Sequence, residues 1–236
     1  MIKLYVCEIS NLIEEIKADE KALDSYLAKL GEKRIEYILK KSKAEDRARA
    51  IGASYLLFFA LKQEGYKPET LPDYAYTQNG KPYLEELSQL YFNISHTKNI
   101  ITCVISNREV GVDVEHVREI KETTINRVFS EKERQMAENS VEGYVQLWTM
   151  KEACAKCIGT GISEIVAGLE IVKKEEKTEV RKLNQDIIKT FCYIELAEGK
   201  VLDSRELPYY YSVCAEQTDK VLEIHTRWDE HQIFLC

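Results

Sequence analysis

Apolar residues along the chain follow two spacings, and each spacing predicts a different kind of element. At the start of residues 1–9 an aliphatic side chain occupies every second position, which predicts a strand. Over 11–30, and again over 32–61, apolar residues recur three or four positions apart, which predicts helices. Gly31 is expected to end the first of these helices.

Turn signals and β-rich runs follow in the middle of the chain. Asn79-Gly80 is a strong signal for a tight turn, because both residue types tolerate positive φ. A short strand is expected at 91–95. The β-rich runs 100–106 and 110–114 are separated by three residues, so we expect them to pair as a hairpin.

The second half of the chain begins with helical spacing over 123–158, where Ser130 and Glu133 form a capping-box pair. Four β-rich segments come after it, at 169–172, 191–196, 209–214 and 222–226. The order of strand, helices and strands thus occurs within 1–107 and again within 108–236. We therefore expect an α+β fold made of two similar α/β halves.

Composition narrows the class of protein. Of 236 residues, 44% are apolar and 31% are charged, which is typical of a globular domain. The net charge of -7 argues against bulk nucleic-acid binding, which needs concentrated positive charge. The longest apolar stretch, 51–61, is far shorter than the roughly 20 residues of a membrane span. The N-terminus does not resemble a signal peptide, so a cytoplasmic protein is expected.

The seven cysteines show no disulfide framework, because their number is odd and their spacing irregular. Reduced thiols are expected. Cys154 and Cys157 form a C-x-x-C inside a helical pattern, which we interpret as core thiols rather than as a redox or metal site.

Two carboxylates share one face of a predicted strand in Val110-Gly111-Val112-Asp113-Val114-Glu115. Asp113 and Glu115 would lie about 7 Å apart at Cα. Hard oxygen ligands so placed suit Mg²⁺, and Gly111 on the same face would leave room for a ligand. Taken alone, the segment also fits the commoner case of a half-buried strand with one solvated acidic face.

A helical stripe could add a third carboxylate and a cation. Trp148, Glu152 and Lys156 are spaced four residues apart and so share one side of a helix. The alternative is an ordinary surface Glu–Lys pair, although a Trp seldom lies on a fully solvated stripe.

Ser95 ends a predicted strand and His96 follows it, in Asn93-Ile94-Ser95-His96. Neighbouring strand residues point to opposite faces, so the two would not act together as nucleophile and base. They are better suited to donate hydrogen bonds to a phosphate, unless they simply form a polar loop. The chain contains no G-x-S-x-G, P-loop or G-x-G-x-x-G motif.

Together these segments, in this order, resemble the 4'-phosphopantetheinyl transferases of the surfactin-synthetase-activating (Sfp) type. The segments that carry the resemblance are Asn79-Gly80-Lys81-Pro82, Phe92-Asn93-Ile94-Ser95-His96, Val110-Gly111-Val112-Asp113-Val114-Glu115 and Trp148-Thr149-Met150-Lys151-Glu152-Ala153-Cys154-Ala155-Lys156, with Gly159 and Gly161 after them. The resemblance implies a pseudo-dimer of two halves, monomeric as a chain, with coenzyme A bound between them.

The resemblance also implies roles for particular residues. It assigns Mg²⁺ to Asp113, Glu115 and Glu152, and the pyrophosphate of coenzyme A to Lys156. It assigns the nucleotide end of coenzyme A to Lys81, Pro82, Ser95 and His96. From the first half it adds Arg34 or its neighbour Lys33, near the 3'-phosphate, and Arg49 as a further basic residue that binds coenzyme A.

The implied reaction is transfer of 4'-phosphopantetheine from coenzyme A to a serine of an apo acyl or peptidyl carrier protein, with 3',5'-ADP as the leaving group. Glu152 would be the general base, a role that competes with its role as a metal ligand. The segment 116–121 mixes apolar and basic residues, so it could dock an acidic carrier or be an ordinary loop. The alternatives are a non-catalytic module that binds coenzyme A or a carrier, and another Mg²⁺-dependent phosphoryl-transfer enzyme.

Overall fold

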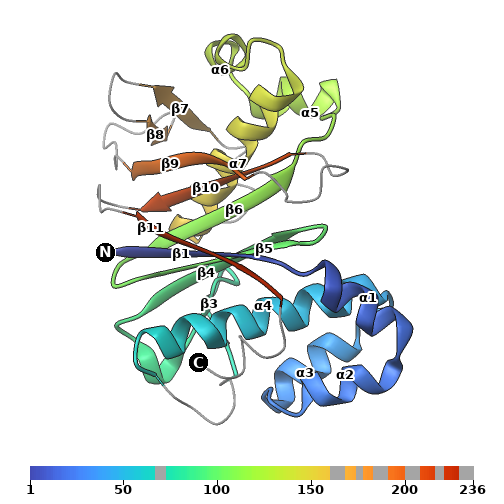
Figure 1. Cartoon of the computed structure of the whole chain (residues 1–236). Coiled ribbons are helices and arrows are strands. Elements are labelled where there is room, and N and C mark those ends of the chain that lie inside the picture. The colour runs from blue at the N-terminus through green and yellow to red at the C-terminus, as the bar shows by residue number, and fades with distance from the viewer. Residues whose placement is uncertain are drawn as a thin grey trace.

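Two β-sheets form the framework of the computed structural model, which describes residues 1–66, 73–159, 168–173, 178–182, 191–199, 208–215 and 221–228 (Figure 1). The first sheet has the order β11 (Val221–Arg227), β1 (Ile2–Glu8), β5 (Ile100–Ser106), β4 (Tyr91–Thr97). The second has the order β6 (Val110–His116), β10 (Tyr209–Ala215), β9 (Phe191–Gly199), β8 (Thr178–Lys182), β7 (Leu169–Lys173). The expected α+β class is confirmed.

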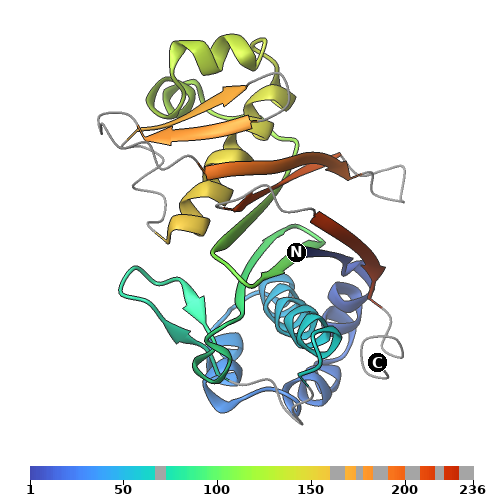
Figure 2. The ribbon, with the colours of Figure 1, turned by 90° about the vertical axis from the view of Figure 1, so that its left-hand side faces the viewer.

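Helices cover the outer face of each sheet. The first half contributes α1 (Ser10–Ala18), α2 (Glu20–Leu27), α3 (Glu32–Leu39) and α4 (Ala44–Gln63). The second half contributes α5 (Glu122–Val128), α6 (Glu131–Met136) and α7 (Val141–Ile158). In Figure 2 the blue and cyan helices α1–α4 lie below the sheets and the yellow-green helices lie above them. None of the helices in the described ranges is long and apolar enough to cross a membrane.

The two sheets also pack against each other through a shared apolar layer. This layer takes residues from β1, β5, β6 and β10, among them Leu4, Val104, Val112 and Val213. Tyr5 on the opposite face of β1 packs instead against the helices α1–α4. The central strands are therefore buried on both faces, and the apolar layer between the sheets joins the two halves of the chain.

The helical segments are shorter than the spacing predicts. The prediction of a single helix over 11–30 is wrong, because the backbone is extended at Asp19 and separates α1 from α2. The Asp19 side chain then caps α2 by accepting a hydrogen bond from the Lys21 amide at 2.8 Å. The block expected over 32–61 likewise divides into α3 and α4. The 123–158 pattern divides into α5, α6 and α7, and the capping box of Ser130 and Glu133 is confirmed at the start of α6.

The hairpin expected between 100–106 and 110–114 is also wrong. Both edges of β5 are occupied, one by β1 and the other by β4. Strand β6 therefore joins β10 in the second sheet. The tight turn at Asn79-Gly80 does form, with Gly80 at a φ of 84° between β2 (Ala75–Tyr76) and β3 (Pro82–Tyr83). A 3₁₀ turn, η1 (Glu85–Leu87), follows.

The last described strand returns to the first sheet. Strand β11 runs parallel to β1, from Ile2 opposite Val221 to Glu8 opposite Arg227. Trp228, next along the chain, packs edge-on against Tyr26 and Tyr55 at ring distances of 5.7 and 5.6 Å. A segment from the end of the sequence thus completes the core around α1–α4. Strand β8 was not predicted from the sequence. Gly161, part of the last segment that carries the resemblance, lies outside the described residues.

Candidate active site

Strand β6 presents its two carboxylates as the alternation predicts. Val112 and Val114 point into the layer between the sheets, while Asp113, only 5% exposed, and the half-buried Glu115 lie on the other face. Gly111 does not leave room for a ligand, contrary to expectation. A Cβ atom there would overlap the Ala153 carbonyl oxygen and the Cys157 amide nitrogen, so the missing side chain lets α7 lie directly on β6.

Helix α7 then places Lys156 against Asp113. The Lys156 ammonium donates to Asp113 Oδ1 at 2.6 Å and to Ser95 Oγ at 2.9 Å. Ser95 in turn donates to the same Oδ1 at 2.8 Å. Three elements, β4, β6 and α7, thus meet at one carboxylate. Within the described residues the other oxygen, Asp113 Oδ2, is buried and has no hydrogen-bond partner.

Every second residue of β4, from Asn93 to Thr97, contacts strand β6. Asn93 Oδ1 accepts from the Val112 amide at 3.0 Å, and Thr97 Oγ1 lies 3.4 Å from Glu115 Oε2. Thr97 is a site residue that the sequence reasoning missed. Its position two residues after Ser95 on the same strand was the available signal, because such residues share a face.

Glu152 completes a group of three carboxylates. Desolvation by burial raises the pKa of Glu152 to about 7, and the negative charges of Asp113 and Glu115 act in the same direction, against the opposing charge of Lys156. Glu115 is also paired with Arg118 at 3.2 Å. An acid with a pKa near neutrality can exchange a proton at physiological pH.

The three carboxylates lie near one another but do not form a preformed metal cage. In the described part of the chain no three His, Cys, Asp or Glu side chains are gathered closely enough to hold a metal ion. Even so, Asp113 Oδ2 has no partner among the described residues, and the charges of Asp113 and Glu115 add to burial in raising the pKa of Glu152. An oxygen-only donor set of this kind suits Mg²⁺.

Positive groups lie on the other side of Lys156. The His96 side chain is exposed, yet its pKa is lowered, first by desolvation and then by the positive charges of Arg49 and Lys156. Arg49 is held in place by an ion pair with Asp46 and by donation to the Lys98 carbonyl at 3.1 Å. Arg49 and Lys156 therefore form a cationic group beside the carboxylates, with a neutral His96 imidazole next to them, and such a group attracts phosphate.

A pocket of about 240 Å³ opens next to Lys156. Its lining residues come from the β2–β3 turn, β4 and α7: Asn79, Gly80, Lys81, Pro82, Asn93, Ile94, Ala155, Lys156 and Gly159. Lys81 belongs to the wall, but its ammonium is ion-paired with Glu109 and donates to the Cys157 carbonyl at 2.8 Å, near the C-terminus of α7. What Lys81 offers the pocket is therefore mainly its aliphatic stem.

Arg34 contacts α4 rather than the cationic group. Its guanidinium donates to Ser54 Oγ at 2.7 Å and to the Ala50 carbonyl at 3.0 Å, and it stacks 4.7 Å over the Tyr37 ring. A second pocket, of about 280 Å³, lies beside Trp148 and is lined by Arg118, Glu119, Ile120, Lys121, Thr124 and Trp148. Cys154 and Cys157 are buried free thiols, as expected.

Comparison with known proteins confirms the resemblance that the motifs indicate. Residues 109–208 match the family model described as the 4'-phosphopantetheinyl transferase superfamily. The 4'-phosphopantetheinyl transferase gsp of Aneurinibacillus migulanus is 35% identical over 125 residues, 51% of this chain and 52% of its own. A 4'-phosphopantetheinyl transferase of Bacillus subtilis is 30% identical over 50% of this chain and 55% of its own, and AcpT of Salmonella typhi is 32% identical over 49% and 63%. The chain thus spans about half to just under two thirds of the length of these relatives.

Proposed function

We propose that this protein is a Mg²⁺-dependent enzyme that transfers 4'-phosphopantetheine from coenzyme A to a serine of an apo acyl or peptidyl carrier protein. The observation that carries the proposal is the ion pair of Lys156 with Asp113, which joins the carboxylates Asp113, Glu115 and Glu152 to a positively charged group of Lys156 and Arg49. A pyrophosphate with a divalent cation complements both groups at once.

In the proposed reaction the hydroxyl oxygen of the carrier serine attacks the β-phosphorus of coenzyme A. A P–O bond to the serine forms, the P–O bond to 3',5'-ADP breaks, and the serine proton leaves. Glu152, with a pKa of about 7, accepts this proton directly or through water. Bound magnesium would neutralise charge on the pyrophosphate. Lys156 turns from Asp113 toward the leaving phosphate, and Asp113 and Glu115 are the proposed metal ligands.

The nucleotide end of coenzyme A is proposed to occupy the pocket beside Lys156. Pro82 and the stem of Lys81 would contact its apolar parts, and Ser95 and His96 would donate to its phosphates. Arg49 is the proposed partner of the 3'-phosphate. Arg34 remains a weaker proposal, since its hydrogen bonds to Ser54 and Ala50 would have to be exchanged for a ligand.

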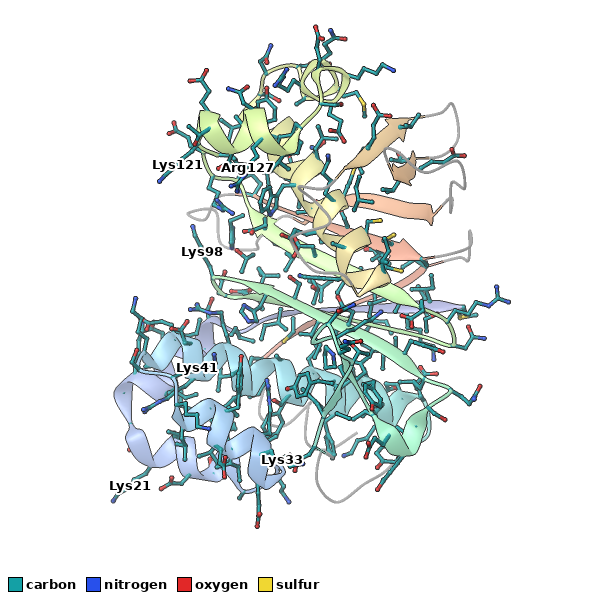
Figure 3. All side chains as sticks on the ribbon, turned by 180° about the vertical axis from the view of Figure 1, so that it is seen from behind. Lys21, Lys33, Lys41, Lys98, Lys121 and Arg127 are labelled. Carbon is teal, nitrogen blue, oxygen red and sulfur yellow. The ribbon has the colours of Figure 1, made fainter. Side chains whose placement is uncertain are left out.

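The carrier protein is proposed to dock beside Trp148. The pocket lined by Arg118–Lys121 borders the carboxylates, because Arg118 pairs with Glu115. Exposed cations continue from it: Figure 3 shows Lys98, Lys121 and Arg127 on the same side of the molecule. An acidic carrier surface would complement them.

The remaining proposals concern the whole chain. We propose a cytoplasmic monomer whose halves, 1–107 and 108–236, are related as a pseudo-dimer, with strand β11 contributed by the second half to the sheet of the first. Coenzyme A would bind where β4 of one half faces β6 of the other.

Mass spectrometry of a carrier protein tests the function directly. The protein is incubated with coenzyme A, Mg²⁺ and an apo carrier, and a carrier variant with its target serine changed to alanine is the control. A mass gain of one phosphopantetheine on the wild-type carrier alone supports transfer. Binding of coenzyme A without a mass gain would instead support a non-catalytic module, and cleavage of its pyrophosphate without labelling would support another phosphoryl-transfer enzyme.

A further inference from the structure

Two opposite charges are buried beside α7, on a different side of the helix from Glu152. Lys151 is 2% exposed and Glu133 is fully buried, and Lys151 Nζ lies 2.9 Å from Glu133 Oε2. Neither residue has a role in the proposed chemistry. Yet Lys151 immediately precedes Glu152 on the helix, so the two side chains leave α7 about 100° apart.

Lys151 connects α7 to two other segments. Its ammonium donates to the Val128 carbonyl at 2.8 Å, at the end of α5, and to the Leu169 carbonyl at 2.6 Å, at the start of β7. With Glu133, three oxygens from different parts of the chain therefore surround a single ammonium group.

Both carboxylate oxygens of Glu133 accept hydrogen bonds from backbone amides. Its Oε2 accepts from the Ser130 amide at 2.8 Å as part of the capping box of α6. Its Oε1 accepts from the Ile171 amide at 2.8 Å, on β7. The pair thus ties α7 to α6 and β7 through directional bonds, and it fixes the rotation of α7 about its own axis.

Stability alone does not explain such a pair. Removing two charges from water is costly, and apolar residues of similar volume often stabilise a protein as well or better. What apolar contacts lack is directional geometry. A helix held only by packing can rotate slightly, and Glu152 would then move relative to Asp113 and Glu115.

We propose that Glu133 and Lys151 are positioning residues that orient Glu152 toward Asp113 and Glu115. This inference rests on the proposed function of that site. Gly111 fixes how closely α7 approaches β6, and the buried pair fixes which side of α7 faces it. Together they set the geometry of the carboxylates for a divalent cation.

The test compares Lys151→Met with the double variant Lys151→Met/Glu133→Gln. The single variant leaves an unpaired buried carboxylate, so its melting temperature should fall sharply. The double variant buries no charge, and the glutamine oxygen can still accept from the Ser130 amide, although the bond from the Ile171 amide is then lost, so part of the stability should return. We expect its affinity for Mn²⁺ in the presence of coenzyme A, measured by electron paramagnetic resonance, to remain about 10-fold or more below wild type.

Kinetics add a second readout. The kcat of the double variant should fall while its KM for coenzyme A stays close to wild type, because Arg49 and His96 are untouched. Leu23→Ala, in the core of the remote helix α2, is the matched control and should lower the melting temperature without changing Mn²⁺ affinity. A double variant with wild-type Mn²⁺ affinity overturns the inference. If the wild-type protein binds Mn²⁺ but transfers no phosphopantetheine, the proposed function is overturned. The Mn²⁺ affinities of the variants would still test the role of Glu133 and Lys151.

Discussion

At the residue scale, period-two alternation placed Asp113 and Glu115 correctly, because a strand leaves each side chain only two faces to choose from. The four-residue spacing of Glu152 and Lys156 also predicted correctly that they lie on one side of a helix. The contacts of long side chains were less predictable. Lys81 and Arg34 find nearby partners, Glu109 and Ser54, that no local pattern reveals.

Asp113 should matter far more for turnover than for folding. A ligated cation is worth several kcal/mol to a phosphoryl-transfer transition state, and about 1.4 kcal/mol is tenfold in rate, so Asp113→Asn should lower kcat by about 100-fold or more. Its melting temperature should change little, because Lys156, with 28% of its side chain exposed, can be solvated instead. Asp24→Asn, at an exposed position on α2, is the control for both assays. Near-normal transfer by Asp113→Asn would contradict the assignment.

Glu152 should make the metal-free protein less stable as pH rises. Its folded-state pKa of about 7 lies above the ordinary glutamate pKa of 4.5, so its contribution is fully favourable below about pH 4.5 and is lost as pH rises through 7. Glu152→Gln should therefore be more stable than wild type at pH 8, by about 1–2 kcal/mol after allowance for partial exposure. The difference should vanish near pH 4.

Urea unfolding in EDTA at pH 4, 6 and 8 measures this difference. Added Mg²⁺ with coenzyme A should reduce the advantage of Glu152→Gln at pH 8, because a bound cation stabilises the charged carboxylate. A constant difference between the two proteins at all three pH values would show that the pKa of Glu152 is not raised.

At the element scale, the sequence indicated which segments are helical and which are extended, but not how the strands pair. Strand β6 follows β5 closely, yet it joins the other sheet because β1 and β4 already occupy both edges of β5. The break at Asp19 was visible only as a good N-cap residue within a helical pattern. Pairing and helix breaks depend on distant segments, which local periodicity does not record.

Substitution of Gly111 by alanine should strongly destabilise the protein. In Gly111→Ala the new methyl group meets the backbone of Ala153 and Cys157, which cannot move without displacing α7. We expect a loss of about 3 kcal/mol or more in urea unfolding, at the upper end of overpacking effects, together with loss of transfer. Gly52→Ala on α4 is the control, because its methyl group meets side-chain atoms of Ile101, Ile9 and Leu12 rather than backbone of a packed neighbour. Equal stability of the two variants would contradict the close packing of α7 on β6.

At the scale of the whole molecule, the α+β class was predictable from the order of elements, but the connection between the two sheets was not. The halves share the apolar layer between their sheets, and β11 crosses from the end of the chain to pair with β1. The sequence of residues 221–228 does not indicate that β11 pairs with β1, because a parallel partner can lie anywhere in the sequence.

This connection predicts that the halves unfold together. Trp228→Ala removes a ring packed against Tyr26 and Tyr55 in the first half, at an expected cost of about 3–5 kcal/mol. It also leaves Trp148, on α7 in the second half, as the sole tryptophan of the chain. Because the apolar layer between the sheets joins the two halves, the urea transition reported by Trp148 fluorescence should shift to lower concentration and coincide with the transition in far-UV circular dichroism. A Trp148 transition that stays in place while circular dichroism becomes biphasic would mean that the second half folds without the first.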